Sequence, residues 1–294
     1  MPRQSYGASP TKRRRATAAE MEERAQFFID YAHRYGPMTV RGLYYQGEVA
    51  SLPGIDKSEA SYAKVQRQVL KLRREGRLRY NTIADATRFM RRPRTYDGWE
   101  AALQETARLY RKSLWSDSKD EVEIWVEKSA LAGVLYPVTS EYDVPLMPTG
   151  GYTSETFAYE AVARLKGTGR ILWVYALYDF DRSGQSAANS LCEKVKRFGA
   201  QLGVPVIFKN LGLSLEQVED MNLPTREPKR KTAADKLWPY DIAAELDAIP
   251  PDDLRAMVRR AIEWHLDSYE LEALRIAEKA ERATLKQFLS GIGG

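Results

Sequence analysis

The chain contains few of the residues that form disulfides and zinc sites. Its 294 residues include one cysteine, Cys192, and two histidines, His33 and His265. A single cysteine excludes an intrachain disulfide, which fits a reducing compartment such as the cytoplasm. A zinc site usually needs several cysteine or histidine ligands. We therefore expect any bound metal ion to be held by oxygen atoms.

Long apolar runs are also absent. No segment approaches the roughly 18 apolar residues needed to cross a bilayer, and the polar, basic amino terminus has no signal-peptide pattern. The sequence therefore predicts a cytoplasmic protein that makes no membrane contact. Its length allows one large domain or two modest ones, each able to bury a core.

Charge is distributed unevenly along the chain. Residues 1–115 contain 23 Lys and Arg against 12 Asp and Glu, whereas residues 116–294 contain 22 against 28. A basic front half followed by an acidic back half indicates a module that binds nucleic acid, joined to one that binds metal. Ordinary variation in solvated surface charge is the simpler alternative.

The front half has the pattern of a small helical DNA-binding domain. Residues 1–17 are basic and aperiodic, so we expect a disordered arm. Helical periodicity follows over three segments, 17–34, 39–49 and 59–75. Residues 77–83 then alternate like an exposed strand. This order predicts a winged helix-turn-helix domain over residues 18–95.

The helix predicted at 59–75 has two distinct faces. One face is an apolar stripe that would anchor the helix, formed by Tyr62, Val65, Val69 and Leu72. Nearly opposite it lie four cations, Lys64, Arg67, Lys71 and Arg74. Cations on an anchored helix suit contacts with DNA phosphates. A plain amphipathic surface helix is the alternative.

The back half has the pattern of an α/β domain. After a connecting segment at 96–118 that includes a helix, apolar strands alternate with helices, the strands being near 121–127, 143–147, 171–179 and 204–209. Such alternation predicts right-handed crossovers and a mainly parallel sheet. Residues 222–240 are expected to be a flexible connection. Helices from about 241 to 289 would complete this domain, residues 119–294.

Acidic residues follow two of the most apolar strands. Glu127 ends the run VEIWV, and Asp179 and Asp181 end the run ILWVYALY. Asp179 and Asp181 occupy alternate positions and project from one side. The carboxyl edge of a parallel sheet is where ligands bind. Three carboxylates gathered there would repel one another unless a hard cation such as Mg²⁺ bound between them, which predicts a metal site for chemistry on phosphates.

Two adjacent tyrosines in the helix predicted at 39–49 point in different directions. Tyr44 shares the inner face with Val40 and Leu43, whereas Tyr45 is rotated by 100° and aligns with Arg41. A phenol with its ordinary pKa near ~10 is a poor nucleophile at neutral pH, and a nearby arginine favours the phenolate or holds the phosphate under attack. Tyr45 is therefore a candidate nucleophile, although most of the 17 tyrosines must be structural.

An ordered set of segments resembles one family. Residues 39–45 (TVRGLYY) resemble the tyrosine motif of the A subunit of type IIB topoisomerases (topoisomerase VI) and of the meiotic double-strand-break transesterase. Residues 126–131 (VEKSAL) and 179–184 (DFDRSG) resemble the two halves of that family's Toprim metal site. Further similar segments are 148–152 (PTGGY), 211–218 (LGLSLEQV) and 245–249 (ELDAI). The resemblance extends over roughly residues 20–265.

The resemblance implies a winged-helix domain joined to a Toprim-like domain that binds Mg²⁺. Tyr45 would attack a phosphodiester of double-stranded DNA and remain linked to the 5′ phosphate, with Arg41 positioning the tyrosine or the phosphate. Glu127, Asp179 and Asp181 would hold the metal. Members of the family work as homodimers in which the tyrosine of one protomer reaches the metal site of the other. Such a topoisomerase or DNA-cleaving transesterase would be found with DNA in the cytoplasm.

The chain also departs from the family. Gly42 stands where the motif usually has an acidic residue, and the chain is shorter than a typical A subunit. It has no Gly-rich ATP-binding segment, so strand passage would need a separate, B-type ATPase subunit. Two other functions fit the residues: a hydrolytic Toprim nuclease in which Tyr45 is incidental, and a non-catalytic DNA-binding partner subunit.

Overall fold

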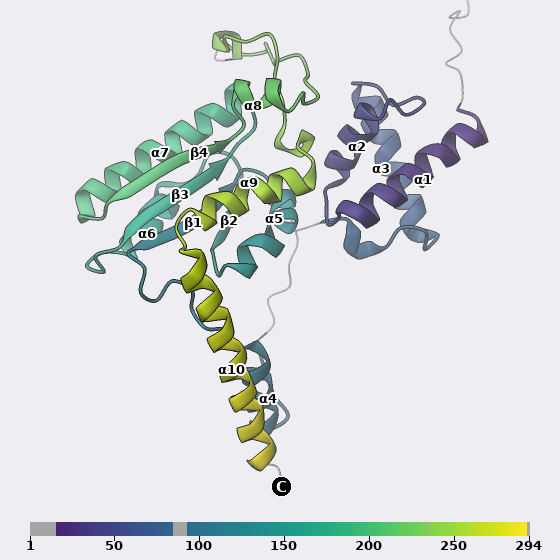
Figure 1. Cartoon of the computed structure of the whole chain (residues 1–294). Coiled ribbons are helices and arrows are strands. Elements are labelled where there is room, and N and C mark those ends of the chain that lie inside the picture. Colours follow the sequence, from purple (N-terminus) through teal and green to yellow (C-terminus); the bar gives the residue numbers. More distant parts are fainter. Residues whose placement is uncertain (1–15, 85–92, 234, 293–294) are drawn as a thin grey trace, which may run out of the picture.

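A four-stranded, all-parallel sheet forms the centre of the back half of the chain (Figure 1). The structure is a computed structural model that describes residues 16–84, 93–233 and 235–292. The strands lie in the order β2-β1-β3-β4, and their bounds are β1 Asp120–Val126, β2 Leu146–Pro148, β3 Ile171–Leu177 and β4 Val206–Gly212. The predicted α/β class with a parallel sheet is confirmed.

Helices cover both faces of this sheet. Alternate residues of β1 and β3 belong to two different cores: Trp125 and Val174 face one side, and Ile124 and Leu177 face the other. The first core contains residues of α6 (Glu155–Ala163) and α7 (Arg182–Leu202), and the second those of α5 (Ser129–Glu141) and α9 (Pro251–Glu263). Because both faces are buried, β3 (ILWVYAL) is apolar throughout, and the acidic residues of β1 (DEVEIWV) lie in its first four positions.

The chain reverses its direction of travel across the sheet between β1 and β3. The crossover from β1 leads outward to β2, and that from β3 leads outward to β4 on the other side. Val126 is paired with Leu177, so Glu127 and Asp179 follow adjacent strands at the same edge. A crevice outside the carboxyl ends of strands at such a switch point is the usual ligand site of an open α/β sheet.

Three helices form a unit at the front of the chain, called here the helical unit (residues 16–84). They are α1 (Ala18–Tyr35), α2 (Val40–Val49) and α3 (Glu59–Arg74), close to their predicted bounds. The side chains of Thr17 and Ser58 cap α1 and α3 by accepting hydrogen bonds from backbone N–H groups. Phe28, Leu43 and Val69 are buried in a core that is continuous with one side of the sheet.

The strand predicted at 77–83 is wrong within the described residues. Tyr80–Thr82 form a 3₁₀ turn (η1), and the segment has a single isolated bridge, from Ile83 to Met38. Leu78 and Ile83 are both buried although they stand at positions of opposite parity, which a regular strand does not allow. Residues 85–92 lie outside the described part of the chain, so the winged-helix assignment stays a prediction.

The helix predicted from about 241 also begins later than expected. Residues 243 and 244 form isolated bridges with Arg226 and Phe180, and η3 (Leu246–Ala248) follows. Helices resume only at α9, which begins at Pro251, and at α10 (Ser268–Ile292). The bridge partners are distant in the chain, so the local sequence pattern could not reveal them. The predicted flexible connection 222–240 includes one of these bridges and η2 (Asp235–Leu237).

The predicted connecting segment 96–118 contains α4 (Trp99–Leu109), which lies beside α10 in an arm that projects away from the sheet (Figure 1). Lys112 Nζ lies 2.7 Å from Glu281 Oε1 and ties the two parts of the arm together. The remaining described helix, α8 (Leu215–Asp220), follows β4. Neither α10 nor any other helix among the described residues has the length and apolar character needed to cross a membrane.

Close packing of α7 on the sheet predicts an effect of adding one methyl group. A Cβ atom at Gly199 would lie 2.7 Å from the carbonyl oxygen of Val204, so the backbone must move. We expect Gly199→Ala to lower the free energy of unfolding by roughly 1–3 kcal/mol, measured by urea denaturation. Gly291→Ala in α10 meets open space and should leave that free energy unchanged or slightly higher. Equal effects of both changes would show that this packing is not tight.

Candidate functional site

A cavity of about 890 Å³ opens at the carboxyl ends of β1 and β3, beside the helical unit. Four of the residues predicted to be functional line it: Arg41, Glu127, Asp179 and Asp181. The other charged residues of its wall are Lys128, Arg226, Lys229, Glu245 and Asp247. The cavity therefore joins segments that are up to about 200 residues apart in the chain.

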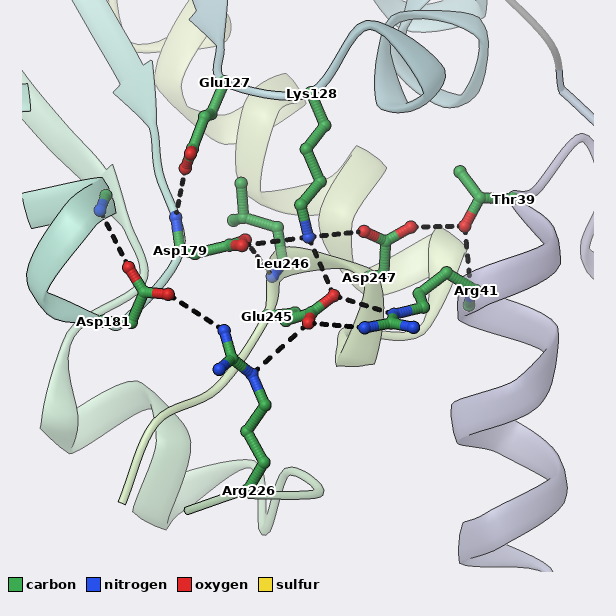
Figure 2. A network of polar contacts seen from close by, with 12 residues as sticks. Thr39, Arg41, Glu127, Lys128, Asp179, Asp181, Arg226, Glu245, Leu246 and Asp247 are labelled. Atoms are coloured by element: carbon green, nitrogen blue, oxygen red, sulfur yellow. Dashed lines mark hydrogen bonds and ion pairs between the residues drawn. The ribbon is translucent and has the colours of Figure 1, made fainter. Parts of the chain in front are cut away.

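Glu127 and Asp179 lie next to each other at the ends of β1 and β3 (Figure 2). The backbone N–H of Asp179 donates to Glu127 Oε2 at 3.1 Å. Asp179 Oδ1 accepts a hydrogen bond from the backbone N–H of Leu246 at 2.8 Å, and its Oδ2 lies 2.9 Å from Lys128 Nζ. Both oxygens of Asp179 are therefore engaged, whereas Figure 2 shows Glu127 in contact with a backbone N–H group.

Asp181 caps the helix that follows it. Its Oδ1 accepts a hydrogen bond from the backbone N–H of Gly184 at 2.8 Å, and its Oδ2 lies 2.9 Å from Arg226 Nη2. A Cβ atom at Gly184 would lie 2.6 Å from the carbonyl oxygen of Asp179. The first turn of α7 can therefore approach the acidic segment this closely only because residue 184 has no side chain.

Lys128 is the centre of the charged network. Its Nζ lies 2.9 Å from Asp179 Oδ2, 2.9 Å from Glu245 Oε2 and 3.0 Å from Asp247 Oδ2. Burial alone would lower the pKa of Lys128, but Asp247, Asp179 and Glu245 outweigh that effect and raise it. Lys128 is therefore charged at neutral pH, and three carboxylates from two segments share its single positive charge.

Arg41 connects α2 to the same network. Its Nε and Nη2 donate to the two carboxylate oxygens of Glu245 at 3.0 and 2.9 Å, across 204 residues of sequence. The guanidinium also lies over the ring of Tyr62, 4.4 Å from its centroid. Such a bidentate interaction with one carboxylate fixes the direction of an arginine side chain. The predicted phosphate-positioning residue is thus held rigidly at the cavity wall.

The segment 245–248 is docked directly on α2. The Thr39 hydroxyl donates to Asp247 and accepts from the backbone N–H of Gly42, and Gln46 Nε2 donates to the carbonyl oxygen of Ala248 at 3.3 Å. A Cβ atom at Gly42 would lie 3.3 Å from the carbonyl oxygen of Asp247. Close approach of this segment gives a physical reason for glycine at position 42.

Docking of this segment also changes the environment of Tyr45. The sequence predicts that Tyr45 projects away from the apolar face, but it is 6% exposed, close to the 4% of Tyr44, and it is not among the residues lining the cavity. Its ring centroid lies 6.0 Å from the Arg41 guanidinium carbon. Burial raises the pKa of Tyr45, Glu245 raises it further, and Arg41 opposes both. In this arrangement Tyr45 is a neutral phenol.

The four cations predicted to contact DNA lie outside the cavity. Lys64, Arg67, Lys71 and Arg74 are all exposed on α3, opposite the buried Val65, Val69 and Leu72. The amphipathic arrangement predicted for this helix is confirmed. Lys71 is partly compensated by Glu75 at 3.6 Å, and Lys64 Nζ donates to the carbonyl oxygen of Gly54 at 3.1 Å.

Two carboxylates at the end of the sheet are poorly compensated. Burial raises the pKa of Asp179 to about 6, with Glu127 adding to the rise and Lys128 opposing it. Burial likewise raises the pKa of Glu127. For Glu245, burial would also raise the pKa, but the hydrogen bonds and charges of Arg41 and Lys128 lower it to about 2. The negative charge that needs more compensation is therefore located at Glu127 and Asp179.

The network contains more negative than positive charge, and a divalent cation would compensate the excess. The network contains five carboxylates, Glu127, Asp179, Asp181, Glu245 and Asp247, and three cations, Lys128, Arg41 and Arg226; among the described residues, Glu127 forms no ion pair with any of these cations. Carboxylate oxygens are the ligands that Mg²⁺ prefers. In the described ranges, however, no three acidic, histidine or cysteine side chains already surround a single ion position. The residues thus fit Mg²⁺ in chemistry and charge, and some of the present ion pairs would have to rearrange around it.

Several residues of the network were not predicted as functional from the sequence. Glu245 and Asp247 lie in a segment expected to be helical, and Arg226 lies in one expected to be a flexible connection. Segment 245–249 was one of the stretches that resemble the topoisomerase family, which was the one available signal. No known protein family matches the chain, and no curated protein sequence matches it.

Loss of the Glu245 ion pairs should have a pH-dependent effect on stability. The Glu245 pKa is lowered to about 2 from an ordinary 4.5, so its contribution is present above pH 4.5 and is lost as the pH falls through about 2. We expect Glu245→Gln to reduce the free energy of unfolding by about 3 kcal/mol at pH 7 and by much less at pH 2.5, measured by urea denaturation. Glu59→Gln removes the exposed partner of Arg41 at 3.6 Å and should change stability little at either pH. A Glu245→Gln effect that is independent of pH would contradict this account.

Proposed function

We propose that the chain is a Mg²⁺-dependent DNA-cleaving transesterase of the type IIB topoisomerase A-subunit class. The observation that supports this proposal is the cavity. It is lined by Arg41 of α2, the helix that contains Tyr45, and by Glu127, Asp179 and Asp181 at the switch point of the sheet. These four residues belong to three segments that resemble separate family motifs. If the tyrosine pair and the Asp-x-Asp motif occurred in this sequence by chance, there would be no reason for these segments to lie at one cavity.

In the proposed reaction, the phenol oxygen of Tyr45 forms a bond to phosphorus as the bond from phosphorus to the 3′ oxygen breaks. The tyrosine loses its proton and the departing 3′ oxygen gains one, leaving a 5′-phosphotyrosyl link and a free 3′ hydroxyl. Arg41 would hold the phosphate through the side of its guanidinium that does not face Glu245. Mg²⁺, held by Glu127, Asp179 and Asp181, would supply positive charge to the phosphate and to the departing oxygen.

Tyr45 must first become accessible. Its phenol is buried beside Glu245, and both burial and that carboxylate disfavour the phenolate. We propose that α2 separates from the segment 245–248 when DNA binds, which frees Tyr45 to reach the metal site of a partner protomer. Lys64, Arg67, Lys71 and Arg74 would contact the DNA backbone. The same proposal includes a homodimer that is located with DNA in the cytoplasm. It also includes a separate ATPase subunit for any strand passage.

A hydrolytic nuclease is the second candidate, and one observation favours it. Tyr45 does not line the cavity, whereas the acidic residues do. In a hydrolytic reaction water would attack the phosphate, and Tyr45 would serve only to pack α2.

The two reactions differ in the effect of removing one hydroxyl group. If Tyr45 is the nucleophile, Tyr45→Phe should lower the yield of protein attached to DNA 5′ ends by at least about a thousandfold, because no other group replaces the attacking oxygen. Supercoiled plasmid, Mg²⁺ and protein would be incubated, quenched with detergent and examined for 5′-linked protein. Tyr44→Phe, which loses a hydrogen bond to the carbonyl oxygen of Asp56, is the matched control and should still form the adduct.

Three outcomes separate the candidate functions. Cutting by Tyr45→Phe with free 5′ phosphates, lost in Asp179→Asn, would establish hydrolysis. Adducts formed by Tyr45→Phe would remove Tyr45 from the mechanism. DNA binding without cutting by the wild-type protein in Mg²⁺ would favour the non-catalytic partner subunit.

Metal binding can be tested without DNA. Because Mg²⁺ would bind the folded chain at Glu127, Asp179 and Asp181, it should stabilise the fold by about 2.7 kcal/mol at a hundredfold excess over its dissociation constant. We expect the melting temperature of the wild-type protein to rise with added MgCl₂ and to fall back when EDTA removes the ion. Glu127→Gln should lose this rise, whereas Glu59→Gln should keep it. An equal rise in both variants would show binding elsewhere.

A further inference from the structure

Arg24 in α1 is a buried cation without an anionic partner among the described residues. It is 6% exposed, and its Nη1 donates to the carbonyl oxygen of Pro53 at 3.2 Å. Its Nε is buried and has no hydrogen-bond partner, and no carboxylate of the described residues forms an ion pair with Arg24. Arginine is rarely buried this deeply unless it is paired, because an unpaired charge loses its hydration without compensation.

A second cavity lies beside this arginine. It has a volume of about 590 Å³ and is formed by the start of α1, the loop at 53–54 and α3. Its two cations are Arg24 and Lys64, and both donate to the same loop, Lys64 Nζ to the carbonyl oxygen of Gly54 at 3.1 Å. The loop turns through Gly54 at φ +70°, where a Cβ atom would be 3.4 Å from Arg24 Nη1. Two separate helices thus direct their cations to one place.

The acidic residue of this cavity does not neutralise the pair. Glu20 lies on the wall, but its Oε2 accepts from the backbone N–H of Thr17 at 2.8 Å as part of the capping box of α1. Neither Arg24 nor Lys64 forms an ion pair with it or with any other described carboxylate. The charged side chains that line the cavity therefore carry a net positive charge.

We propose that Arg24 and Lys64 bind a phosphate group of a nucleic-acid backbone in this cavity. A guanidinium offers a planar set of donors that matches phosphate oxygens, and Lys64 adds a point charge from α3. An anion there would compensate the charge of both cations. The choice of nucleic acid as the source rests on the proposed function, and the site gives α1 and the 53–54 loop a part in holding the DNA.

This site has a signature that a purely structural arginine does not share. An unpaired buried charge destabilises the protein when no anion is bound, so Arg24→Met should raise the melting temperature by a few degrees in phosphate-free buffer. The same variant should bind duplex DNA about tenfold more weakly and show a salt dependence of log K shallower by about one. Arg34→Met, a change at an exposed arginine of the same helix, should do neither.

The experiment has two parts that use the full-length protein. Thermal unfolding is compared in sodium phosphate and in sodium chloride of equal ionic strength and pH, and DNA affinity is measured by fluorescence anisotropy over a range of salt. Phosphate should raise the melting temperature of the wild-type and Arg34→Met proteins but not of Arg24→Met. Lys64→Met should weaken DNA binding as well, and the double variant should lose little more than either single one, because both cations hold one phosphate.

Each result decides the inference. A lower melting temperature of Arg24→Met with unchanged DNA affinity would make Arg24 a structural support of the loop and overturn the site. Stabilisation by phosphate without any change in DNA affinity would overturn the nucleic-acid assignment in favour of free phosphate. If the wild-type protein binds DNA and Arg24→Met binds equally well, this inference fails while the proposed function stands. If the wild-type protein binds no DNA, the proposed function itself fails.

Discussion

The contact of Lys128 with carboxylates from two distant segments is the interaction on which the site depends. In the sequence, Asp179 follows β3, whereas Glu245 and Asp247 lie between β4 and α9. Without a cation between them, three buried carboxylates would repel one another, and the extended segment that contains Glu245 would have no reason to lie across the end of the sheet. Lys128, just after the end of β1, supplies this cation and lies 2.9–3.0 Å from all three carboxylates. Both the position of Lys128 at the switch point and its positive charge are therefore needed to hold these two segments together.

The same network joins the helical unit to the sheet. Glu245 accepts two hydrogen bonds from Arg41 and lies beside Lys128, so one carboxylate contacts a cation from each half of the chain. Asp247 repeats the pattern with Thr39 and Lys128. Because breaking a buried pair leaves an uncompensated charge, the two halves are coupled more strongly than their apolar contact alone would provide. Any movement that exposes Tyr45 must act against these pairs.

Compensation by cations differs among the carboxylates of the network. Arg41 and Lys128 fully compensate Glu245, but Glu127 and Asp179 retain raised pKa values. A divalent ion bound at Glu127 would compete with Lys128 for Asp179, and a phosphate would compete with Glu245 for Arg41. In the proposed function, metal and DNA would therefore weaken the contacts that keep Tyr45 buried, which links substrate binding to exposure of the nucleophile.

Sequence alone was sufficient for the α/β class, the approximate positions of the four strands, the bounds of α1, α2 and α3, the cation-bearing face of α3 and the placement of Glu127 beside Asp179. These features follow from local periodicity, from helix caps and breakers, and from the rule that parallel strands end at one edge. Only the tertiary structure decided that residues 243–248 are not part of an α-helix, that Glu245 and Asp247 belong to the site, and that Tyr45 is buried. All three depend on bridges and ion pairs between residues far apart in the chain, which leave no periodic signal in the sequence near them.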